Sequence, residues 1–437
     1  MIVGIVVVVV GVLASIALHE VGHMVPARRF GVRVSQYMVG FGPTLWSRVR
    51  GETEYGLKAV PLGGYVRLVG MYPPAPAGAV AADRPTGFFG RLVADAREQS
   101  TEEVRPGEEG RAFYHLSAPK KVVVMLGGPV MNLVIALVLL LVVDVGIGLP
   151  TATTTVASVV PCVTSTSATT APSTCTADDP QSPAAAAGLE PGDEIVAVGG
   201  TAVTGWDQMV GLIDGAAGTP TEVDVVRGGA RTTLTVTPAP VQRQVVSAAG
   251  TPVVDGDGDP VTRPGGYVGL APTSERVSQP VSSVPGAVWD QVAATAGVVV
   301  TLPAKIVGVA EAAFGGQERD ATSVMGVVGV GRIAVDAAES DSPVVDRLAF
   351  LLSLLASLNV ALFVFNLIPL LPLDGGHVVN ALYEGAKRQV ARVRGAPRPG
   401  PADVARMMPV AYVMFVVLVG VGGLLIYADI VNPVTIG

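Results

Sequence analysis

Four long runs without charged residues constrain this chain most. They span residues 1–18, 122–143, 348–373 and 408–427, and each is long enough to cross the roughly 30 Å hydrocarbon core of a bilayer as a helix. The composition agrees, because 50% of the 437 residues are hydrophobic, 15% are charged, and the mean hydropathy is +0.53. The sequence therefore predicts a polytopic α-helical membrane protein with four transmembrane helices.

The remaining composition excludes other classes. The net charge is −7 and no basic face is evident, so we expect no nucleic-acid partner. Two cysteines are too few for a disulfide-rich scaffold or a cysteine-based structural zinc site. The first run is interpreted as a span rather than a cleaved signal peptide, because it lacks a basic leading region and ends in polar residues.

The charges between the runs predict an orientation. Lys and Arg outnumber Asp and Glu by 14 to 9 in residues 24–121 and by 6 to 2 in residues 375–407, whereas residues 144–347 hold 9 against 22. Basic loops stay in the cytosol. We therefore expect a multi-pass protein of the inner or plasma membrane with both termini outside. Cys162 and Cys175 would lie outside the cell, where a disulfide can form.

The segments between the runs differ in composition. A β-hairpin is expected around residues 53–68, and residues 74–112, rich in Ala, Pro, Glu and Arg, are expected to be a mobile insertion. In the outside segment, residues 183–238 alternate between strand and helix patterns, with strands at 194–198, 221–226 and 232–237 and a helix at 206–213. This alternation predicts a small α+β unit.

Residues 285–314 are apolar but interrupted. Asp290, Pro303, Lys305 and Glu311 break the run. A fifth span here would also place the basic loop at 375–407 outside. The sequence therefore predicts an amphipathic helix on the membrane surface.

The chemistry begins where the first run ends, at His19-Glu20-Val21-Gly22-His23. Residues four apart share a helix face, so His19 and His23 can bind one zinc ion while Glu20 reaches a water molecule beside it. The alternative is a pair of histidines that merely cap a helix at the membrane interface. Ionisable residues next to a membrane span favour the functional interpretation.

A catalytic zinc needs a third protein ligand, and Asp374 is the best candidate. Pro369 and Pro372 interrupt the third run just before it, which frees the backbone to turn a carboxylate inward. Spans one and three both run from outside to inside, so Asp374 and His23 reach the same depth near the cytoplasmic face. His115 and His377 are the other available histidines, and a simple helix-terminating turn at Asp374 is the alternative.

These motifs together resemble the bacterial site-2 proteases. The resemblance rests on HExxH in the first run, Gly128-Pro129-Val130-Met131-Asn132 in the second, and the segment from Asn366 to Gly375 in the third. It implies a β-rich membrane-associated loop region and an α+β PDZ-like domain outside. It also implies a zinc-dependent intramembrane endopeptidase that cleaves single-span proteins, such as anti-sigma factors already trimmed outside, in regulated intramembrane proteolysis.

The resemblance also implies roles for residues. His19, His23 and Asp374 would bind Zn²⁺, and Glu20 would be the general base. Phe41 and Gly42 would belong to a membrane-reentrant β-loop that presents substrate as an extended strand. Two intramembrane amides, Asn132 and Asn366, would bond the substrate backbone or pack between helices.

Outside, residues 188–193 resemble the carboxylate-loop side of a PDZ domain. Binding of a freshly exposed C-terminus is the first expectation, and a size filter against untrimmed substrates is the second. The chain departs from the family pattern in two places. Pro372 stands one residue later than in some members, and residues 74–112 match no familiar motif, so a regulatory element stays open there as the alternative to a flexible loop.

The predicted organisation has ten segments. They are transmembrane helix 1 with HExxH (1–24), the cytoplasmic or membrane-associated loop (25–121), transmembrane helix 2 (122–146), a linker (147–182), the PDZ-like core (183–240), a linker with a strand (241–284), the amphipathic helix (285–314), transmembrane helix 3 with the third ligand (344–376), a cytoplasmic loop (377–406) and transmembrane helix 4 (407–428).

Three alternatives stay open at this point. One is a non-catalytic membrane PDZ receptor or scaffold. Another is a membrane metalloprotease with a cytosolic active site, in which Glu52 or Glu54 supplies the third ligand. The last is a transporter that uses Glu20 and Asp374 as coupling residues, although no internal repeat supports it. The scaffold and the transporter predict no stoichiometric metal.

Overall fold

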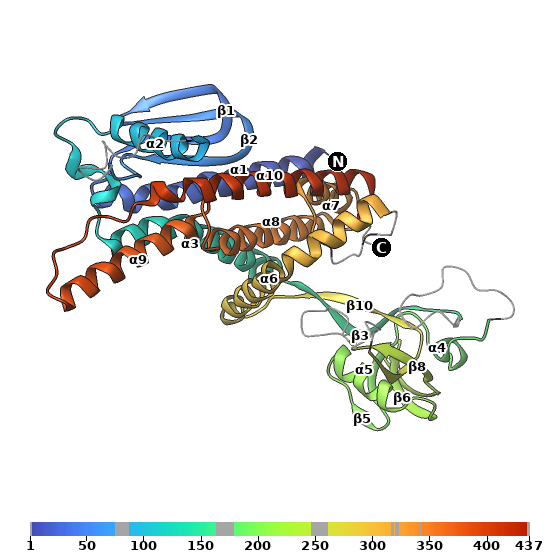
Figure 1. The fold of residues 1–437 in the computed structure, drawn as a ribbon. Coiled ribbons are helices and arrows are strands. Elements are labelled where there is room, and N and C mark those ends of the chain that lie inside the picture. Colours follow the sequence, from blue (N-terminus) through green and yellow to red (C-terminus); the bar gives the residue numbers. More distant parts are fainter. Residues whose placement is uncertain are drawn as a thin grey trace. The chain divides into compact units, whose positions relative to one another are not determined.

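The computed structural model describes residues 2–74, 87–162, 179–245, 261–315, 319, 323–340 and 342–434. The chain divides into two compact units, which are described separately (Figure 1). The first joins Met1–Ile147 to Pro280–Gly437, and the second is Gly148–Gln279. Short 3₁₀ turns lie at Glu109–Arg111, Phe113–His115, Val281–Ser283 and Val404–Met407.

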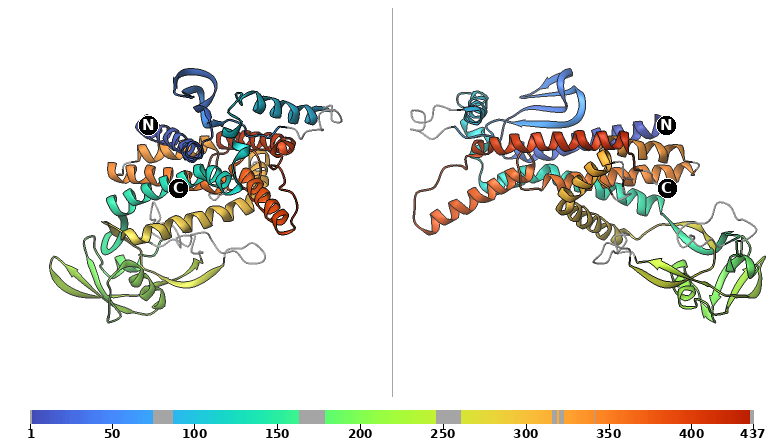
Figure 2. Two further views of the ribbon diagram at one scale, coloured as in Figure 1. Left: turned by 90° about the vertical axis from the view of Figure 1, so that its left-hand side faces the viewer. Right: turned by 45° about the vertical axis from the view of Figure 1, so that its right-hand side comes forward.

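Long apolar helices form the centre of the first unit, where they lie side by side (Figures 1 and 2). They are α1 (Ile2–Arg29), α3 (Ala118–Leu140, extended by a π-helical turn at Leu141–Ile147), α8 (Val344–Asn366) and α10 (Met408–Val431). Each coincides with one uncharged run. Five helices of the described residues are long and apolar enough to cross a membrane, and the fifth is Val281–Gly315. The helical membrane character is therefore confirmed, whereas the number of spans, predicted as four, stays a prediction.

Helix α6 (Val284–Gly315) is this fifth helix, at the position where an amphipathic helix was expected. Near its start, Val284 packs in one apolar cluster with Leu140, the last residue of α3. Near its end, Asn432 Nδ2 donates to the Ala312 carbonyl at 3.2 Å, just beyond the C-terminus of α10. The same cluster contains Ala356, in the middle of α8, so α6 begins beside the middle of the bundle and ends where α10 terminates. The helix is inclined to its neighbours (Figure 2).

Two further helices of this unit were not expected. Helix α7 (Val327–Glu339) packs on α1, where a Cβ atom at Gly4 would stand 2.4 Å from Ala338 Cβ. Helix α9 (Asp374–Val393) occupies much of the predicted cytoplasmic loop. Its buried Glu384 pairs at 2.7 Å with Lys121 of α3. The charge of Glu384, one of those by which this segment was interpreted as a loop, therefore holds α9 against α3.

A β layer covers the bundle at its other end (Figure 1). It consists of β1 (Val34–Arg50) and β2 (Thr53–Leu68), which confirms the expected β-rich region. Both strands bend. Residues 36–39 pair with 64–67 on one side and with 54–57 on the other, while 44–50 pair with 53–58. The stretch 64–68 is therefore an outer edge, since among the described strands it pairs only with β1.

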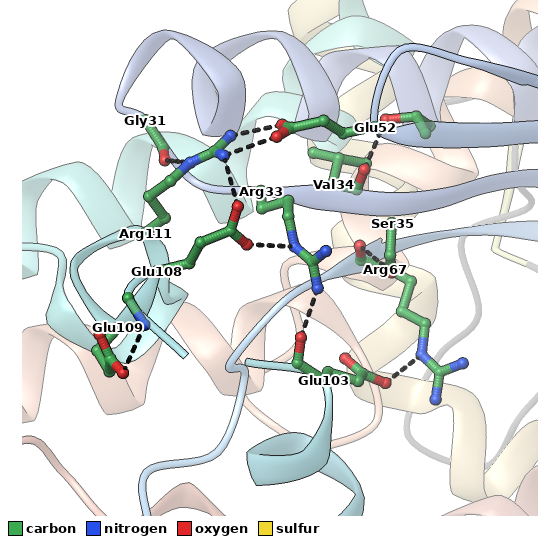
Figure 3. A network of polar contacts seen from close by, with 12 residues as sticks. Gly31, Arg33, Val34, Ser35, Glu52, Arg67, Glu103, Glu108, Glu109 and Arg111 are labelled. Atoms are coloured by element: carbon green, nitrogen blue, oxygen red, sulfur yellow. Dashed lines mark hydrogen bonds and ion pairs between the residues drawn. The ribbon is translucent and has the colours of Figure 1, made fainter. Parts of the chain in front are cut away.

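The expectation of a mobile insertion at 74–112 is wrong for residues 87–112. Residues 87–102 form helix α2 (Gly87–Glu102), and the following turns are fastened to the sheet by ion pairs (Figure 3). Arg33, which is buried, pairs with Glu108 at 3.3 Å, and Arg67 pairs with Glu103 at 2.5 Å. These pairs join residues far apart in the chain, so composition alone gave no sign of them. Residues 75–86 lie outside the described part.

Buried side chains join α1, the sheet and α3 into one core at this end of the bundle. They are Met24, Ala27, Val32, Val34, Leu68, Phe113, Leu116, Val124 and Met125. This packing brings the last turns of α1 against the start of α3 and the edge stretch of β2. The functional residues lie next to this core.

The second unit is an antiparallel sheet in the order β10-β3-β4-β6-β7, with β5 beside β4 and a separate β8–β9 pair. Its elements are β3 (Leu149–Val159), α4 (Pro183–Ala186), β4 (Glu194–Val198), β5 (Thr201–Ala202), α5 (Trp206–Gly215), β6 (Thr221–Arg227), β7 (Ala230–Val236), β8 (Ala239–Gln244), β9 (Thr262–Tyr267) and β10 (Leu270–Val277). The expected strands and helix are all present. The unit extends beyond 183–240 on both sides, because β3 and β10 pair with each other.

Cys162 lies at the edge of this unit and is disulfide-bonded. The sequence holds one other cysteine, Cys175, which lies outside the described residues. A disulfide fits the oxidising exterior that the loop charges predict for this segment.

Candidate metal centre

The HExxH residues lie on α1, which stays helical through them to Arg29. One turn apart, the His19 and His23 rings point to the same side, with their Nε2 atoms 3.2 Å from each other. Glu20 is buried, with 9% of its surface exposed. His19 and His23 therefore share one face of the helix, as their spacing predicts.

Glycines on two helices allow the imidazoles to sit between backbones. A Cβ atom at Gly22 of α1 would stand 2.3 Å from the Gly127 carbonyl oxygen of α3, and one at Gly127 would stand 2.0 Å from the Gly22 oxygen. A Cβ at Gly128 would stand 2.2 Å from His23 Nε2. Any side chain at these positions would separate α1 from α3, so the glycines are required for the site to close.

Asp374 reaches the histidines from the start of α9. Helix α8 ends at Asn366, and the proline-containing turn that follows leads directly into α9. Gly375 packs against this turn so closely that a Cβ atom would stand 2.3 Å from the Ile368 carbonyl oxygen. The Asp374 carboxylate then lies with Oδ2 at 3.4 Å from His19 Nε2 and 3.3 Å from His23 Nε2.

The three ligand atoms fit a zinc ion. Tetrahedral zinc with nitrogen and oxygen ligands at about 2.0–2.1 Å places neighbouring ligand atoms about 3.3 Å apart. The observed separations of 3.2, 3.3 and 3.4 Å match that spacing. Asp374 Oδ2 is also buried without a hydrogen-bond partner in the described part of the chain, which is costly unless a cation is bound there.

The other nitrogen of each imidazole has its own neighbour. His23 Nδ1 lies 2.8 Å from the Val124 carbonyl oxygen, so it donates its hydrogen there and Nε2 is free to bind a metal. His19 Nδ1 lies 3.1 Å from Asn132 Nδ2 on α3. Asn132, predicted as a substrate-binding residue, is therefore a neighbour of a ligand.

The β2 edge runs past Glu20. A Cβ atom at Gly64 would stand 3.2 Å from Glu20 Cγ, so the stretch 64–68 borders the predicted general base. Phe41 stacks on Tyr65 of this stretch, with ring centroids 6.2 Å apart. Gly42 has φ +84°, a conformation that favours glycine. The predicted β-loop thus lies next to the strand that borders the site.

Other predicted candidates lie elsewhere. Asn366 is half-buried at the last turn of α8. Among the described residues the metal-binding group contains only His19, His23 and Asp374. The alternative ligands Glu52 and Glu54 are occupied by Arg111 and Gln36 respectively. A cytosolic site built on them is therefore not formed.

Sequence reasoning missed two features of the site. The packing role of Gly22 and Gly127 was not anticipated, although the pair Gly127-Gly128 in an apolar run signals a close approach of helices. The role of the Val124 carbonyl could not be predicted, because backbone groups carry no sequence signal.

An apolar helical bundle that brings HExxH and an aspartate to one metal-binding point defines a class of protein, the membrane metallopeptidases. The comparison with protein families agrees, since the family described as Peptidase family M50 matches residues 7–397. The chain belongs to this family, the site-2 proteases, and the resemblance drawn from its motifs is confirmed.

Named relatives are similar over nearly the whole chain. Zinc metalloprotease Rip1 of Mycobacterium tuberculosis is 35% identical, covering 99% of this chain and 98% of its own. Rip1 of Mycolicibacterium smegmatis is also 35% identical with the same coverage. Metalloprotease MmpA of Caulobacter vibrioides is 28% identical over 86% of this chain and 85% of its own. The predicted activity class, a metalloendopeptidase, and the predicted zinc cofactor are thereby confirmed.

Proposed function

We propose that this protein is a zinc-dependent intramembrane endopeptidase that cuts the transmembrane segments of single-span membrane proteins. The observation that carries the proposal is the convergence of His19, His23 and Asp374 at one end of the apolar bundle, with Glu20 close to them and bordered by the edge stretch of β2. The relatives named zinc metalloprotease support the metal and the chemistry. Anti-sigma factors already trimmed outside are the proposed substrate class, in regulated intramembrane proteolysis.

The ligands would hold zinc through His19 Nε2, His23 Nε2 and Asp374 Oδ2. Zinc bound there supplies a Lewis acid that polarises the scissile carbonyl and lowers the pKa of water towards about 7. The Glu20 carboxylate takes the proton of the attacking water and returns it to the leaving amine.

A substrate helix must unwind before it can be cut, because its carbonyls are held in i→i−4 hydrogen bonds. Among the described strands, the stretch 64–68 pairs on one side only, with β1, and it borders Glu20, so an unwound segment can add to its other side as a further strand. Phe41 and Gly42 shape the loop next to this edge. Asn366 would bond the substrate backbone near Asp374.

The proposed topology keeps four spans, with both termini outside and the active site near the cytoplasmic face. The loop charges support this orientation. The contacts of α6 support it too, because Val284 packs in one cluster with Ala356, in the middle of α8, and Ala312 contacts Asn432 beyond the end of α10, so that α6 runs from the middle of the bundle to one end. We therefore propose that α6 lies across the outer part of the bundle and does not span.

For the outside unit, the contacts favour the size filter over capture of a C-terminus by residues 188–193. Five backbone N–H groups of this loop are hydrogen-bonded within the unit, and the sixth residue is proline, which has none. The donors are Gly188 to Ala185 O, Leu189 to Ala184 O, Glu190 to Asp193 Oδ2, Gly192 to Val156 O and Asp193 to Glu190 O. This loop has no free N–H group to offer a carboxylate.

The test is a reconstituted cleavage assay in liposomes with a single-span substrate whose outer part has been removed. Wild type should cut within or beside the membrane segment, and a chelator should stop it. Glu20→Gln should keep zinc and thermal stability yet lose cleavage, because an amide cannot accept the proton. Glu54→Gln, a glutamate outside the site, is the matched control and should cut normally. Equal product from wild type and Glu20→Gln would end the proposal.

A further inference from the structure

Asn132 of α3 is wholly buried, with 0% of its surface exposed, and its amide faces the zinc-site residue His19. It lies one helical turn after Gly128, which contacts both histidines. The separation of 3.1 Å joins Asn132 Nδ2 to His19 Nδ1. No other hydrogen-bond partner of His19 Nδ1 is found among the described residues. The Asn132 amide is therefore the group that can favour or disfavour a hydrogen on that nitrogen.

Metal binding fixes which imidazole nitrogen carries the hydrogen. An imidazole that binds zinc through Nε2 has its hydrogen on Nδ1 and needs an acceptor there. His23 has such an acceptor in the Val124 carbonyl. The nearest atom to His19 Nδ1 is Asn132 Nδ2, which is itself a donor. The acceptor end of the same amide, Asn132 Oδ1, is buried and has no partner in the described part of the chain.

We propose that Asn132 is a positioning residue for His19. With Oδ1 oriented towards His19, the amide accepts the Nδ1–H of the ring, which holds Nε2 towards the point shared with His23 and Asp374. This orientation satisfies two groups at once, because the unpaired Oδ1 gains a donor and the imidazole gains an acceptor. The inference rests on the proposed zinc site and replaces the substrate-backbone role expected for Asn132.

A second buried asparagine of the bundle provides a matched control. Asn359 of α8 is also 0% exposed. Its Nδ2 donates to Ser15 Oγ at 2.9 Å and to the Leu355 carbonyl at 2.8 Å. Its Oδ1, like that of Asn132, is buried without a partner in the described part of the chain. Asn359 joins α8 to α1 and does not contact His19, so the contact with His19 is what distinguishes Asn132 from this control.

The first experiment measures zinc affinity on the purified full-length protein by competition with a chelator. Asn132→Leu should weaken zinc binding about 10- to 100-fold, the usual effect of removing the partner of a ligand histidine. Asn132→Asp should bind zinc within about threefold of wild type, because a carboxylate oxygen can accept the same hydrogen. Asn359→Leu should leave zinc affinity unchanged even if it lowers thermal stability. Equal zinc affinities for Asn132→Leu and Asn359→Leu would overturn the proposal.

A spectroscopic readout separates positioning from packing. The chain has four histidines, so ¹⁵N-histidine NMR of the zinc-loaded protein can resolve the His19 Nδ1–H signal, assigned by its loss in His19→Ala. This signal should disappear by exchange with water in Asn132→Leu and shift in Asn132→Asp, but stay in place in Asn359→Leu. If Asn132→Leu does not fold, the zinc affinity and the His19 signal of Asn132→Asp test the proposal instead. In Asn132→Asp, a zinc affinity close to that of wild type together with a shifted His19 signal supports the proposal, and an unshifted signal contradicts it.

The result also distinguishes this inference from the proposed function. If His19→Ala binds zinc as tightly as wild type, the zinc site itself is misplaced. If His19→Ala loses zinc and Asn132→Leu does not, only the role of Asn132 fails. In the His19→Ala background, Asn132→Leu should cause no further loss of zinc affinity, since its effect acts through that ring.

Discussion

Gly128 of α3 lies directly against His23 of α1, so that a Cβ atom at Gly128 would stand 2.2 Å from the His23 Nε2 atom. This is the atom with which His23 would bind zinc. The same Cβ would stand 2.7 Å from His19 Nε2. Two histidines of the predicted motif therefore depend on a glycine of another helix for the space that they occupy.

Gly128→Ala should consequently impair the metal site. The added methyl would push the His23 ring away or separate α1 from α3, and we expect zinc affinity to fall at least tenfold, as for loss of ligand positioning. Gly146→Ala, at a glycine in the π-helical turn after α3 with open space around it, is the control and should bind zinc normally. Zinc titration of both purified variants gives the comparison, and unchanged affinity in Gly128→Ala would contradict the packing described here.

The ligands themselves give a second prediction. His19→Ala, His23→Ala and Asp374→Ala should each lower zinc occupancy tenfold or more, because every one removes one of three protein ligands. His115→Ala removes a histidine that lies outside the metal-binding group and should keep full zinc. Mass spectrometry after dialysis measures the zinc content of the three ligand variants and of the His115→Ala control. Full zinc in Asp374→Ala would place the third ligand elsewhere.

The uncharged runs predicted the bundle well because lipid imposes length and polarity on a spanning helix whatever its neighbours are. The HExxH spacing likewise predicted the shared helix face, since His19 and His23 need only one helical turn. The proximity of Asp374 to the two histidines could be predicted because Pro369 and Pro372 mark an irregular backbone within an apolar run. In each case the physical cause is local to a short stretch of sequence.

The features that the sequence did not reveal depend on contacts between distant segments. Helix α9 looked like a basic loop, because the partner that makes its Glu384 a buried residue is Lys121, 263 positions away. The insertion after β2 looked mobile because the pairing of Arg33 with Glu108 cannot be read from composition. The loop at 188–193 resembled a carboxylate-binding loop, and only the fold shows its N–H groups already engaged.

A third prediction concerns acid stability of the second unit. Hydrogen bonds from the Arg227 guanidinium hold the pKa of the Asp193 carboxyl below its usual range. A lowered pKa in the folded state stabilises the fold above the unfolded pKa, which is about 3.9, and this stabilisation is lost as pH falls through the lower folded value. The thermal unfolding midpoint of this unit, measured in the full-length protein, should therefore decrease when the pH is lowered below about 4.

Asp193→Asn tests this assignment. It should lower the midpoint at pH 7 and reduce the further drop on acidification, because the ion pair is already absent. Asp207→Asn, at an exposed residue of α5, should behave as wild type. Differential scanning calorimetry with each variant at pH 7 and pH 3 provides the data. An acid response in Asp193→Asn as steep as in wild type would assign the pH dependence to other groups.

The last prediction addresses how the chain crosses the membrane, since five helices qualify as spans by length and composition. If α6 lies across the bundle, as its contacts with Leu140 and Asn432 indicate, then single cysteines at Thr201 and Ser342 face outside and one at Arg392 faces the cytosol. If α6 spans, Ser342 moves to the cytosol and Arg392 to the outside. Labelling of intact cells with a membrane-impermeant maleimide, in a background with both native cysteines replaced by serine, should therefore modify Thr201→Cys and Ser342→Cys but not Arg392→Cys until the cells are lysed. Protection of Ser342→Cys together with labelling of Arg392→Cys would show that α6 is a fifth span and that the two termini lie on opposite sides.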